Sequence, residues 1–224
     1  MIESYYIDTS KFSLNKFREI LKSKDILPGR LILKDQIDER FDYIKSKGLS
    51  SLADLLDVLK TKPRIEQFSK ESGLSTDYLT ILRREANSYI SDPVRLSEMP
   101  FAEFEIIERL DQYGIKDTKQ LYNAAIRSID RVLLSNKLGI SSEKVQELVS
   151  LCDLVRITGV GPVFVRIIYD SGIHSVADFL SVDADELFVR LSKTNNENGF
   201  TKAKFSQKDI EYCLELGREL PIIK

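Results

Sequence analysis

The stretch Ile157-Thr158-Gly159-Val160-Gly161-Pro162 decides the local fold, because it sets a tight Gly-Val-Gly turn between two apolar helical patterns. Apolar residues recur at helical spacing from Val145 to Val155 before the turn and from Val165 to Ile168 after it. A helix that begins at such a turn presents backbone N–H groups, which can hold a phosphate. We therefore predict a helix, a tight turn and a second helix, with positive φ at Gly161.

A second motif recurs three times, each time starting with a glycine that follows an apolar helical stretch. The three segments read G-L-S-S-L-A-D-L from Gly48, G-I-K-D-T-K-Q-L from Gly114 and G-I-H-S-V-A-D-F from Gly172. The glycine is typical of a residue that closes a helix in the left-handed conformation. Three residues later we predict an N-cap, followed after three more by a side chain that can complete a capping box. The predicted caps are Ser51, Asp117 and Ser175, with partners Asp54, Gln120 and Asp178.

A serine farther along each copy is predicted to cap another helix: Ser75, Ser141 and Ser206. Eleven residues after each serine the sequence has a small residue, which predicts close approach of another segment; these are Ala86, Cys152 and Gly217. Both landmarks advance by 66 residues from the first copy to the second, and the third copy carries a polar insertion at about 194–204. Repetition at a fixed period predicts helical units that bury their faces on one another.

The predicted fold class is all-α, since no alternation typical of strands occurs after residue 12. Asp92-Pro93 and Met99-Pro100 bracket the expected joint, because a residue before proline is disfavoured in the α region. We predict an N-terminal lead and helix over 1–30, a degenerate first copy over 31–93, a second copy over 94–155 and a third over 156–224.

Composition sets further limits on function. The chain of 224 residues is 42% hydrophobic and 30% charged, which is ordinary for a globular protein, and its net charge of −2 does not favour nucleic acid or membranes. The first residues lack the apolar core of a signal peptide, and no apolar run reaches the roughly 18 residues of a membrane span. Both cysteines lie on predicted inward helix faces. We expect a cytoplasmic protein with reduced thiols and no membrane partner.

No residue set points to a reaction, so we predict a protein without catalytic residues, cofactor or metal. His174 is the only histidine, which excludes a histidine pair for a metal. The Gly159–Gly161 turn lacks the third glycine of a dinucleotide fingerprint and the Gly-Lys-Ser/Thr of a P-loop. Four acidic residues share one helical face, where a solvated surface is favoured over a metal site: Asp35, Asp38, Glu39 and Asp42.

The tandem pattern resembles helix-hairpin-helix repeat proteins and, more narrowly, an uncharacterised bacterial family known only as a domain of unknown function. The resemblance is strongest over Cys152–Leu191 and weaker, as degenerate copies, over Leu31–Leu151. Helix-hairpin-helix proteins contact nucleic-acid backbone through this hairpin without reading sequence. The resemblance therefore implies such a role for Gly159, Val160 and Gly161, with Arg166 nearby.

Other residues extend this candidate nucleic-acid site. Arg156 and Thr158 flank the hairpin, and the insertion contributes Lys193, Lys202 and Lys204 with aromatic Phe200 among them. The alternatives are that the glycines only permit a turn and that the insertion is a solvated loop. The corresponding turns of the other copies carry carboxylates that would repel phosphate; they are Lys34–Asp38 and Phe101-Ala102-Glu103.

Two functional classes remain. The first is a non-enzymatic protein that binds DNA or RNA backbone weakly, without sequence specificity, through the third copy. The second is an adaptor that presents a groove or apolar patch to a partner protein. The hairpin is the only feature with a specific mechanism, and it favours the first class.

Overall fold

The protein is almost entirely helical in the computed structural model, which describes residues 5–100 and 103–222. Helix accounts for 65% of the chain, about twice the usual share in globular proteins. Within the two described ranges there is no strand, only isolated bridges between Ser13 and Ser51 and between Arg95 and Asp117. The predicted all-α class is confirmed. No helix in the described part of the chain is both long and apolar enough to cross a membrane.

The chain divides into two compact units: unit 1 comprises Met1–Tyr6 and Ser91–Lys224, and unit 2 comprises Ile7–Ile90. The second and third predicted copies thus lie in one unit. The first helix, which the sequence placed in a separate lead over 1–30, belongs to unit 2 together with the first copy.

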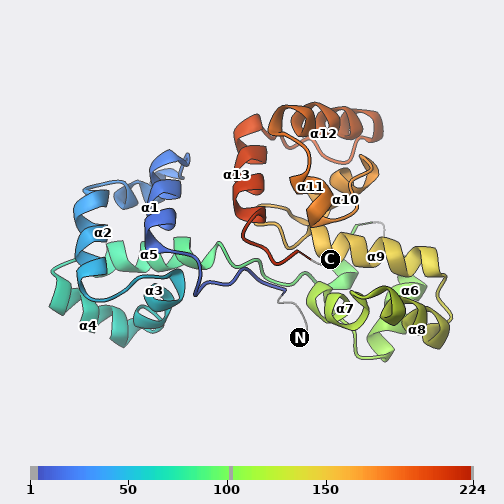
Figure 1. The fold of residues 1–224 in the computed structure, drawn as a ribbon, viewed down its shortest axis with the longest axis horizontal. Coiled ribbons are helices and arrows are strands. Elements are labelled where there is room, and N and C mark those ends of the chain that lie inside the picture. Colours follow the sequence, from blue (N-terminus) through green and yellow to red (C-terminus); the bar gives the residue numbers. More distant parts are fainter. Residues whose placement is uncertain (1–4, 101–102, 223–224) are drawn as a thin grey trace. The chain divides into compact units, whose positions relative to one another are not determined.

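Unit 2 forms its core around Phe17, which meets Phe41 and Tyr89 edge to face with ring centroids 5.8 and 5.2 Å away. Ser13 caps the first helix by accepting a hydrogen bond from the Lys16 N–H. The helices, shown in blue to blue-green in Figure 1, are α1 (Leu14–Ser23), the 3-10 helix η1 (Pro28–Leu33), α2 (Ile37–Ser46), α3 (Leu52–Val58), α4 (Lys62–Ser72) and α5 (Thr76–Asn87).

Unit 1 contains the remaining helices, coloured from green to red in Figure 1. The core of its first half gathers apolar side chains from α7 and α9, including Leu121, Val145 and Cys152. The elements are η2 (Leu96–Glu98), α6 (Phe104–Gln112), α7 (Thr118–Ala125), α8 (Ser128–Leu138), α9 (Ser142–Leu154), α10 (Pro162–Asp170), α11 (Val176–Leu180), α12 (Ala184–Asn198) and α13 (Gln207–Gly217).

A helix, a glycine turn and three further helices occur in the same order in α2–α5, α6–α9 and α10–α13. Gly48, Gly114 and Gly172 close the first helix of each set with φ of 83°, 87° and 83°, so their predicted left-handed conformation is confirmed. The predicted caps at the next helix are confirmed as well. Ser51, Asp117 and Ser175 accept hydrogen bonds from the N–H groups of Asp54, Gln120 and Asp178.

The predicted serine caps of the last helix in each set are also confirmed: Ser75, Ser141 and Ser206 begin α5, α9 and α13. The small residues eleven positions later are all buried. At Gly217 an added Cβ would lie 3.2 Å from Cδ2 of Leu180, so any side chain there would crowd α11. Close packing therefore explains the small residue at this position.

The polar insertion of the third copy is partly helical. The corresponding helices α4 and α8 have 11 residues, whereas α12 has 15 and is closed by its C-cap Gly199, where φ is 67°. Beyond it, the Asn195 side chain accepts from the Thr201 N–H at 3.0 Å and donates to the Thr201 carbonyl at 3.1 Å. The expected loop thus begins at Gly199 and is fastened to the helix before it.

Tyr5 is anchored in the fold, although the sequence predicted only an N-terminal lead there. Tyr5 is 3% exposed, its hydroxyl hydrogen-bonds Thr118 Oγ1 at 2.8 Å, and its ring meets that of Tyr122 edge to face. Tyr5 therefore contributes to the core of unit 1.

Candidate nucleic-acid interface

The hairpin between α9 and α10 has the predicted order of helix, tight turn and helix. After α9 ends, the Val160 N–H donates to the Ile157 carbonyl at 3.0 Å, and Gly161 then caps α10 with Pro162 as its first residue. Proline suits this position because its fixed φ matches the helix and the first N–H has no helical partner.

The two glycines have different roles from those predicted. Gly161 has φ of −95°, and no atom lies within 4 Å of the position of an added Cβ. Gly159 has φ of 94°, and its added Cβ would lie 3.2 Å from Sγ of Cys213 on α13. The prediction of positive φ at Gly161 is wrong, because the reversal is made two residues earlier. Only Gly159 is required by backbone geometry.

Arg156 is placed in the core, which removes it from the candidate interface. Its side chain is 0% exposed. Its Nε donates to the Tyr5 carbonyl at 3.0 Å, Nη1 to the Tyr122 hydroxyl at 2.7 Å and to Asp153, and Nη2 to the Pro221 carbonyl at 2.8 Å. An arginine with these acceptors joins both ends of the chain to the hairpin and has no surface left for a phosphate.

Asp153 explains why this arginine is buried. Its second oxygen accepts from the Val176 N–H at 2.8 Å, at the start of α11. At the starts of α3 and α7 the equivalent N–H groups, of Leu52 and Thr118, donate instead to backbone carbonyls of a preceding segment. A carboxylate thus replaces a carbonyl in the third set of helices. Burial raises the pKa of Asp153 and Arg156 opposes that shift, so the arginine balances the substituted charge.

The other hairpin residues are also less accessible than the sequence suggested. Thr158 and Val160 are 6% and 7% exposed, so their side chains contribute little to a surface. Arg166 is held by Glu147 and by Asp170, whose Oδ1 lies 2.6 Å from Nη2. These two carboxylates neutralise the guanidinium. Glu147 comes from α9, ten residues before Ile157 at the start of the hairpin stretch.

The basic insertion is brought to the start of α10 by an aromatic contact that the sequence did not predict. Phe205 in the loop meets Phe164, in the first turn of α10, with ring centroids 5.0 Å apart. Lys202 and Lys204 are exposed on the same loop. In Figure 1 this loop runs back along α12 toward α13. An aromatic three residues after Gly161 and another before the cap Ser206 are the sequence signal that could have indicated this contact.

Lys193 differs from the two loop lysines. It lies on α12, is 73% exposed, and has Glu197 one turn away with 3.8 Å between Nζ and Oε1. Gly161, Lys202 and Lys204 are therefore the open residues of the candidate site, and the two lysines lie on a loop whose Phe205 contacts α10. The structure leaves Arg156 in the core, Arg166 neutralised and Lys193 beside a carboxylate.

The corresponding turns of the other two sets are less suited to an anion. The cap of α2 is Gln36, the only described non-glycine residue with positive φ, and it is followed by Asp38 and Glu39 in the first turn. The cap of α6 is Glu103. Phe101 and Ala102, which were predicted to form this turn with Glu103, lie outside the described residues. Carboxylates next to these helix starts already interact with the positive end of the helix dipole.

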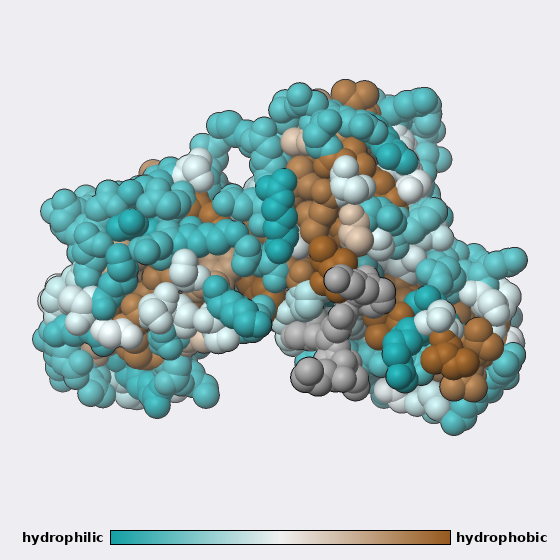
Figure 2. Space-filling model, viewed as in Figure 1, coloured by the Kyte–Doolittle hydropathy of each residue, from teal (hydrophilic) through white to brown (hydrophobic). Residues whose placement is uncertain are grey.

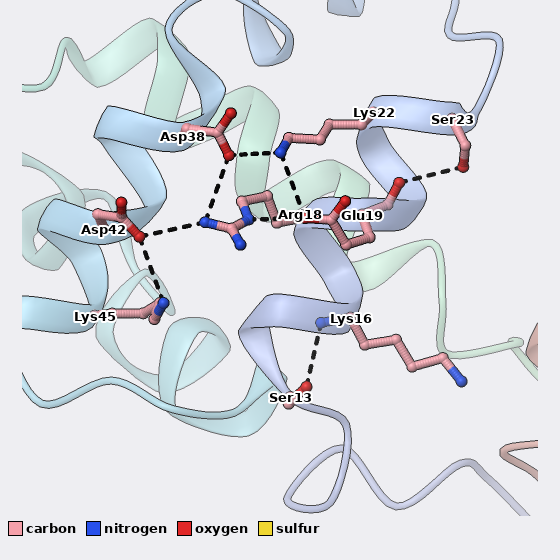
Figure 3. A network of polar contacts seen from close by, with 9 residues as sticks. All are labelled: Ser13, Lys16, Arg18, Glu19, Lys22, Ser23, Asp38, Asp42 and Lys45. Carbon is pink, nitrogen blue, oxygen red and sulfur yellow. Dashed lines mark hydrogen bonds and ion pairs between the residues drawn. The ribbon is translucent and has the colours of Figure 1, made fainter.

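The acidic face on and before α2 forms an ion-pair network, as Figure 3 shows. Asp38 lies 2.6 Å from Lys22 Nζ, and Arg18 reaches Asp42 at 3.2 Å, so basic residues of α1 cover this face. Asp35 pairs with Arg40 at 2.6 Å. In the part of the chain that is described, no three His, Cys, Asp or Glu residues gather in a way that could hold a metal ion.

His174 and the cysteines supply no reactive group to this region. His174 is exposed, and its ring lies against that of Tyr169 with centroids 4.5 Å apart. Cys152 and Cys213 are free, buried thiols, and burial raises the pKa of both, that of Cys213 to about 12. Thiols with raised pKa values are poor nucleophiles at neutral pH.

Comparison with known proteins gives one match. A protein-family model described as a domain of unknown function (DUF4332) matches residues 103–218, which contain α6 to α13. No curated protein matches the chain, and no solved structure does. The match covers slightly more than half of the 224 residues and includes the hairpin and the basic loop. The chain therefore belongs to the DUF4332 family.

Proposed function

We propose that this chain is a non-enzymatic helix-hairpin-helix protein that binds nucleic-acid backbone weakly and without sequence specificity. The site consists of the start of α10 with Lys202 and Lys204. The observation that carries the proposal is the ring contact between Phe164 and Phe205, because it brings a loop with two exposed lysines to an open helix start. Lysines attract phosphates, and the first N–H groups of a helix can bind one.

The cap of α10 supports the same site. Most helices in this chain begin at a serine or aspartate whose side chain accepts an N–H of the first turn, for example Ser141 and Asp183. Gly161 has no side chain to do so, and α10 carries no acidic residue in its first turn. The N–H groups of Val163 and Phe164 are therefore open to an external acceptor, and no carboxylate of that turn repels it.

The size of the site predicts weak binding. With Arg156 buried and Arg166 paired, two lysines remain, so we expect about two phosphate contacts. For duplex DNA the slope of log K against log salt is then about −2. The affinity should not depend on base sequence, because contacts to phosphate carry no sequence information.

The test is fluorescence anisotropy with labelled duplex and single-stranded DNA and RNA of mixed sequence, titrated at several salt concentrations from about 50 mM. The double variant Lys202→Ala/Lys204→Ala should flatten the slope to near zero and leave the circular dichroism spectrum unchanged. The matched control is Lys62→Ala/Lys70→Ala on exposed positions of α4, which should retain the slope. Absence of any anisotropy change at 50 mM salt with all four nucleic acids would refute the proposal.

A specific observation also favours the adaptor function. Three aliphatic residues of α8 point to solvent at helical spacing: Ile129, Val132 and Leu133 are 57%, 48% and 60% exposed. Figure 2 shows a brown patch at the lower right, where Figure 1 draws α8. Contiguous exposed apolar residues often mark a surface for a partner protein. A partner that co-purifies with the wild-type protein and with Asn136→Asp, but not with Leu133→Asp, would support this second function.

A further inference from the structure

Unit 1 contains a cleft of about 410 Å³ that the proposed nucleic-acid site does not use. It opens between α8, α9 and the start of α11. Its floor includes Val149 and Val176, which are 2% and 1% exposed, and Ile222 lies at its rim. Arg131, Gln146 and His174 supply polar groups around this apolar floor. A volume of this size lies within the range of small-molecule sites, which combine apolar walls with a few fixed polar groups.

Two arginines line the cleft, Arg127 and Arg131. Asp153 is the one carboxylate among the described residues that line it, and both of its oxygens already accept hydrogen bonds, from Arg156 and from the Val176 N–H. Gln146 donates to Ser150 across the wall at 3.2 Å. A molecule in the cleft therefore meets a wall whose carboxylate is occupied and on which the Arg131 guanidinium can donate. Such a wall favours a ligand rich in acceptors.

Arg131 is the group that is placed to receive a charge. Its Nη1 donates to the Ile126 carbonyl at 2.6 Å and more weakly to the Ala125 carbonyl at 3.4 Å, at the C-terminal end of α7. Within the described residues, Nε and Nη2 of Arg131 have no acceptor. The guanidinium is thus fixed by one nitrogen while its other edge remains a donor pair. That edge matches the two oxygens of a carboxylate or phosphate.

The neighbouring arginine differs in this respect. Arg127 also lines the cleft, but its Nε and Nη2 bind the two oxygens of Asp130 at 2.5 and 2.8 Å. Its charge and its donor edge are therefore engaged. Arg127 is the N-cap residue of α8 and Arg131 lies four residues later within that helix, so Arg127 provides a control for Arg131.

We propose that this cleft binds a small organic anion, with its carboxylate or phosphate group on Arg131 and an apolar body over Val149 and Val176. The inference is independent of the nucleic-acid site, which lies at the start of α10. The apolar floor and the guanidinium must act together, since neither a bare anion nor a neutral apolar molecule would satisfy both.

The test is isothermal titration calorimetry of the full-length protein with four probes: phenyl phosphate, benzoate, inorganic phosphate and benzyl alcohol. Phenyl phosphate or benzoate should bind at least tenfold more tightly than inorganic phosphate and than benzyl alcohol. Arg131→Lys retains the charge and a donor for the α7 carbonyls but loses the paired edge, so it should weaken binding about tenfold. Arg127→Lys should leave binding within about twofold, and circular dichroism checks that both variants fold.

The relative affinities of phenyl phosphate and benzoate identify which acid group the cleft prefers, and either order agrees with the proposal. Three results would overturn it: no heat from either aromatic acid up to 10 mM, equal weakening by Arg127→Lys and Arg131→Lys, or inorganic phosphate binding as tightly as phenyl phosphate. None of these results bears on the salt titration of the nucleic-acid site, so the two proposals fail separately.

Discussion

Substitution of the two hairpin glycines by serine should change stability in opposite directions. Gly159 has φ of 94°, where a side chain costs about 1–2 kcal/mol of backbone strain. The new Cβ would also lie 3.2 Å from Cys213 Sγ, so α13 must shift. Against this, replacing glycine recovers about 0.4–1 kcal/mol of unfolded-state entropy. We therefore expect Gly159→Ser to lower the free energy of unfolding by about 1–3 kcal/mol.

At Gly161 both effects favour serine. Its φ of −95° is open to any residue, and no atom lies within 4 Å of the added Cβ. A serine there should accept the Phe164 N–H, as Ser206 accepts the Asp209 N–H at the start of α13. Backbone entropy and the new cap together should raise the free energy of unfolding by about 0.5–1.5 kcal/mol. Urea unfolding followed by circular dichroism at 222 nm measures both changes.

The same substitution tests the proposed site, because the serine hydroxyl would occupy an N–H group that a phosphate needs. Gly161→Ser should thus be more stable than the wild-type protein yet bind nucleic acid about two- to tenfold more weakly in the anisotropy assay. A variant that is stabilised and binds with unchanged affinity would show that the helix start makes no phosphate contact. Destabilisation by Gly161→Ser would refute the assignment of conformational roles to the two glycines.

Three further substitutions probe the interior and the caps. Arg156→Met leaves Asp153 buried without its partner, so it should lower the free energy of unfolding by about 3–5 kcal/mol, and adding Asp153→Asn should recover part of that loss in urea unfolding. Cys152→Leu should overpack the core of unit 1 and lower the free energy of unfolding by about 1–3 kcal/mol. The control Glu143→Leu, on the exposed face of α9, should leave it almost unchanged. An unchanged melting temperature for Cys152→Leu would contradict the close packing inferred at this position. Hydrogen bonds from two backbone N–H groups lower the pKa of Asp54 to about 2. The ionised side chain therefore stabilises the folded protein above pH 4, and this stabilisation is lost as the pH falls toward 2. Asp54→Asn should lower the free energy of unfolding at pH 6, and the difference from the wild-type protein should shrink progressively below pH 4.

The local signals in the sequence predicted the caps and helix ends well, because these depend on residues three or four positions apart. Ser51 is the N-cap of α3 and Gly48 has positive φ, as the neighbouring residues in the sequence predicted. Positive φ was assigned to the wrong hairpin glycine because both glycines permit it and no neighbouring residue in the sequence distinguishes them.

The candidate site was harder to predict than the fold. Arg156 follows an apolar helix and could have faced either way, and its acceptors come from both ends of the chain. Arg166 looked available because Glu147, 19 residues earlier, gave no local sign of the pairing. Charged residues that are close in space but distant in sequence decide which arginines can reach a ligand. The helical periodicity of the sequence does not predict these contacts.

The location of Tyr5 has a consequence for how the molecule is made. Tyr5 belongs to unit 1, while all of Ile7–Ile90 belongs to unit 2, so in the order of synthesis unit 2 is an insertion within unit 1. The ribosome completes unit 2 before any of Thr118, Tyr122 or Arg156, which Tyr5 contacts, has been translated. Tyr5 therefore cannot make all of these contacts until Arg156, 151 residues later, has been translated. A fragment that begins at Ser91 would lack this residue, and the Nε of Arg156 would lose its acceptor.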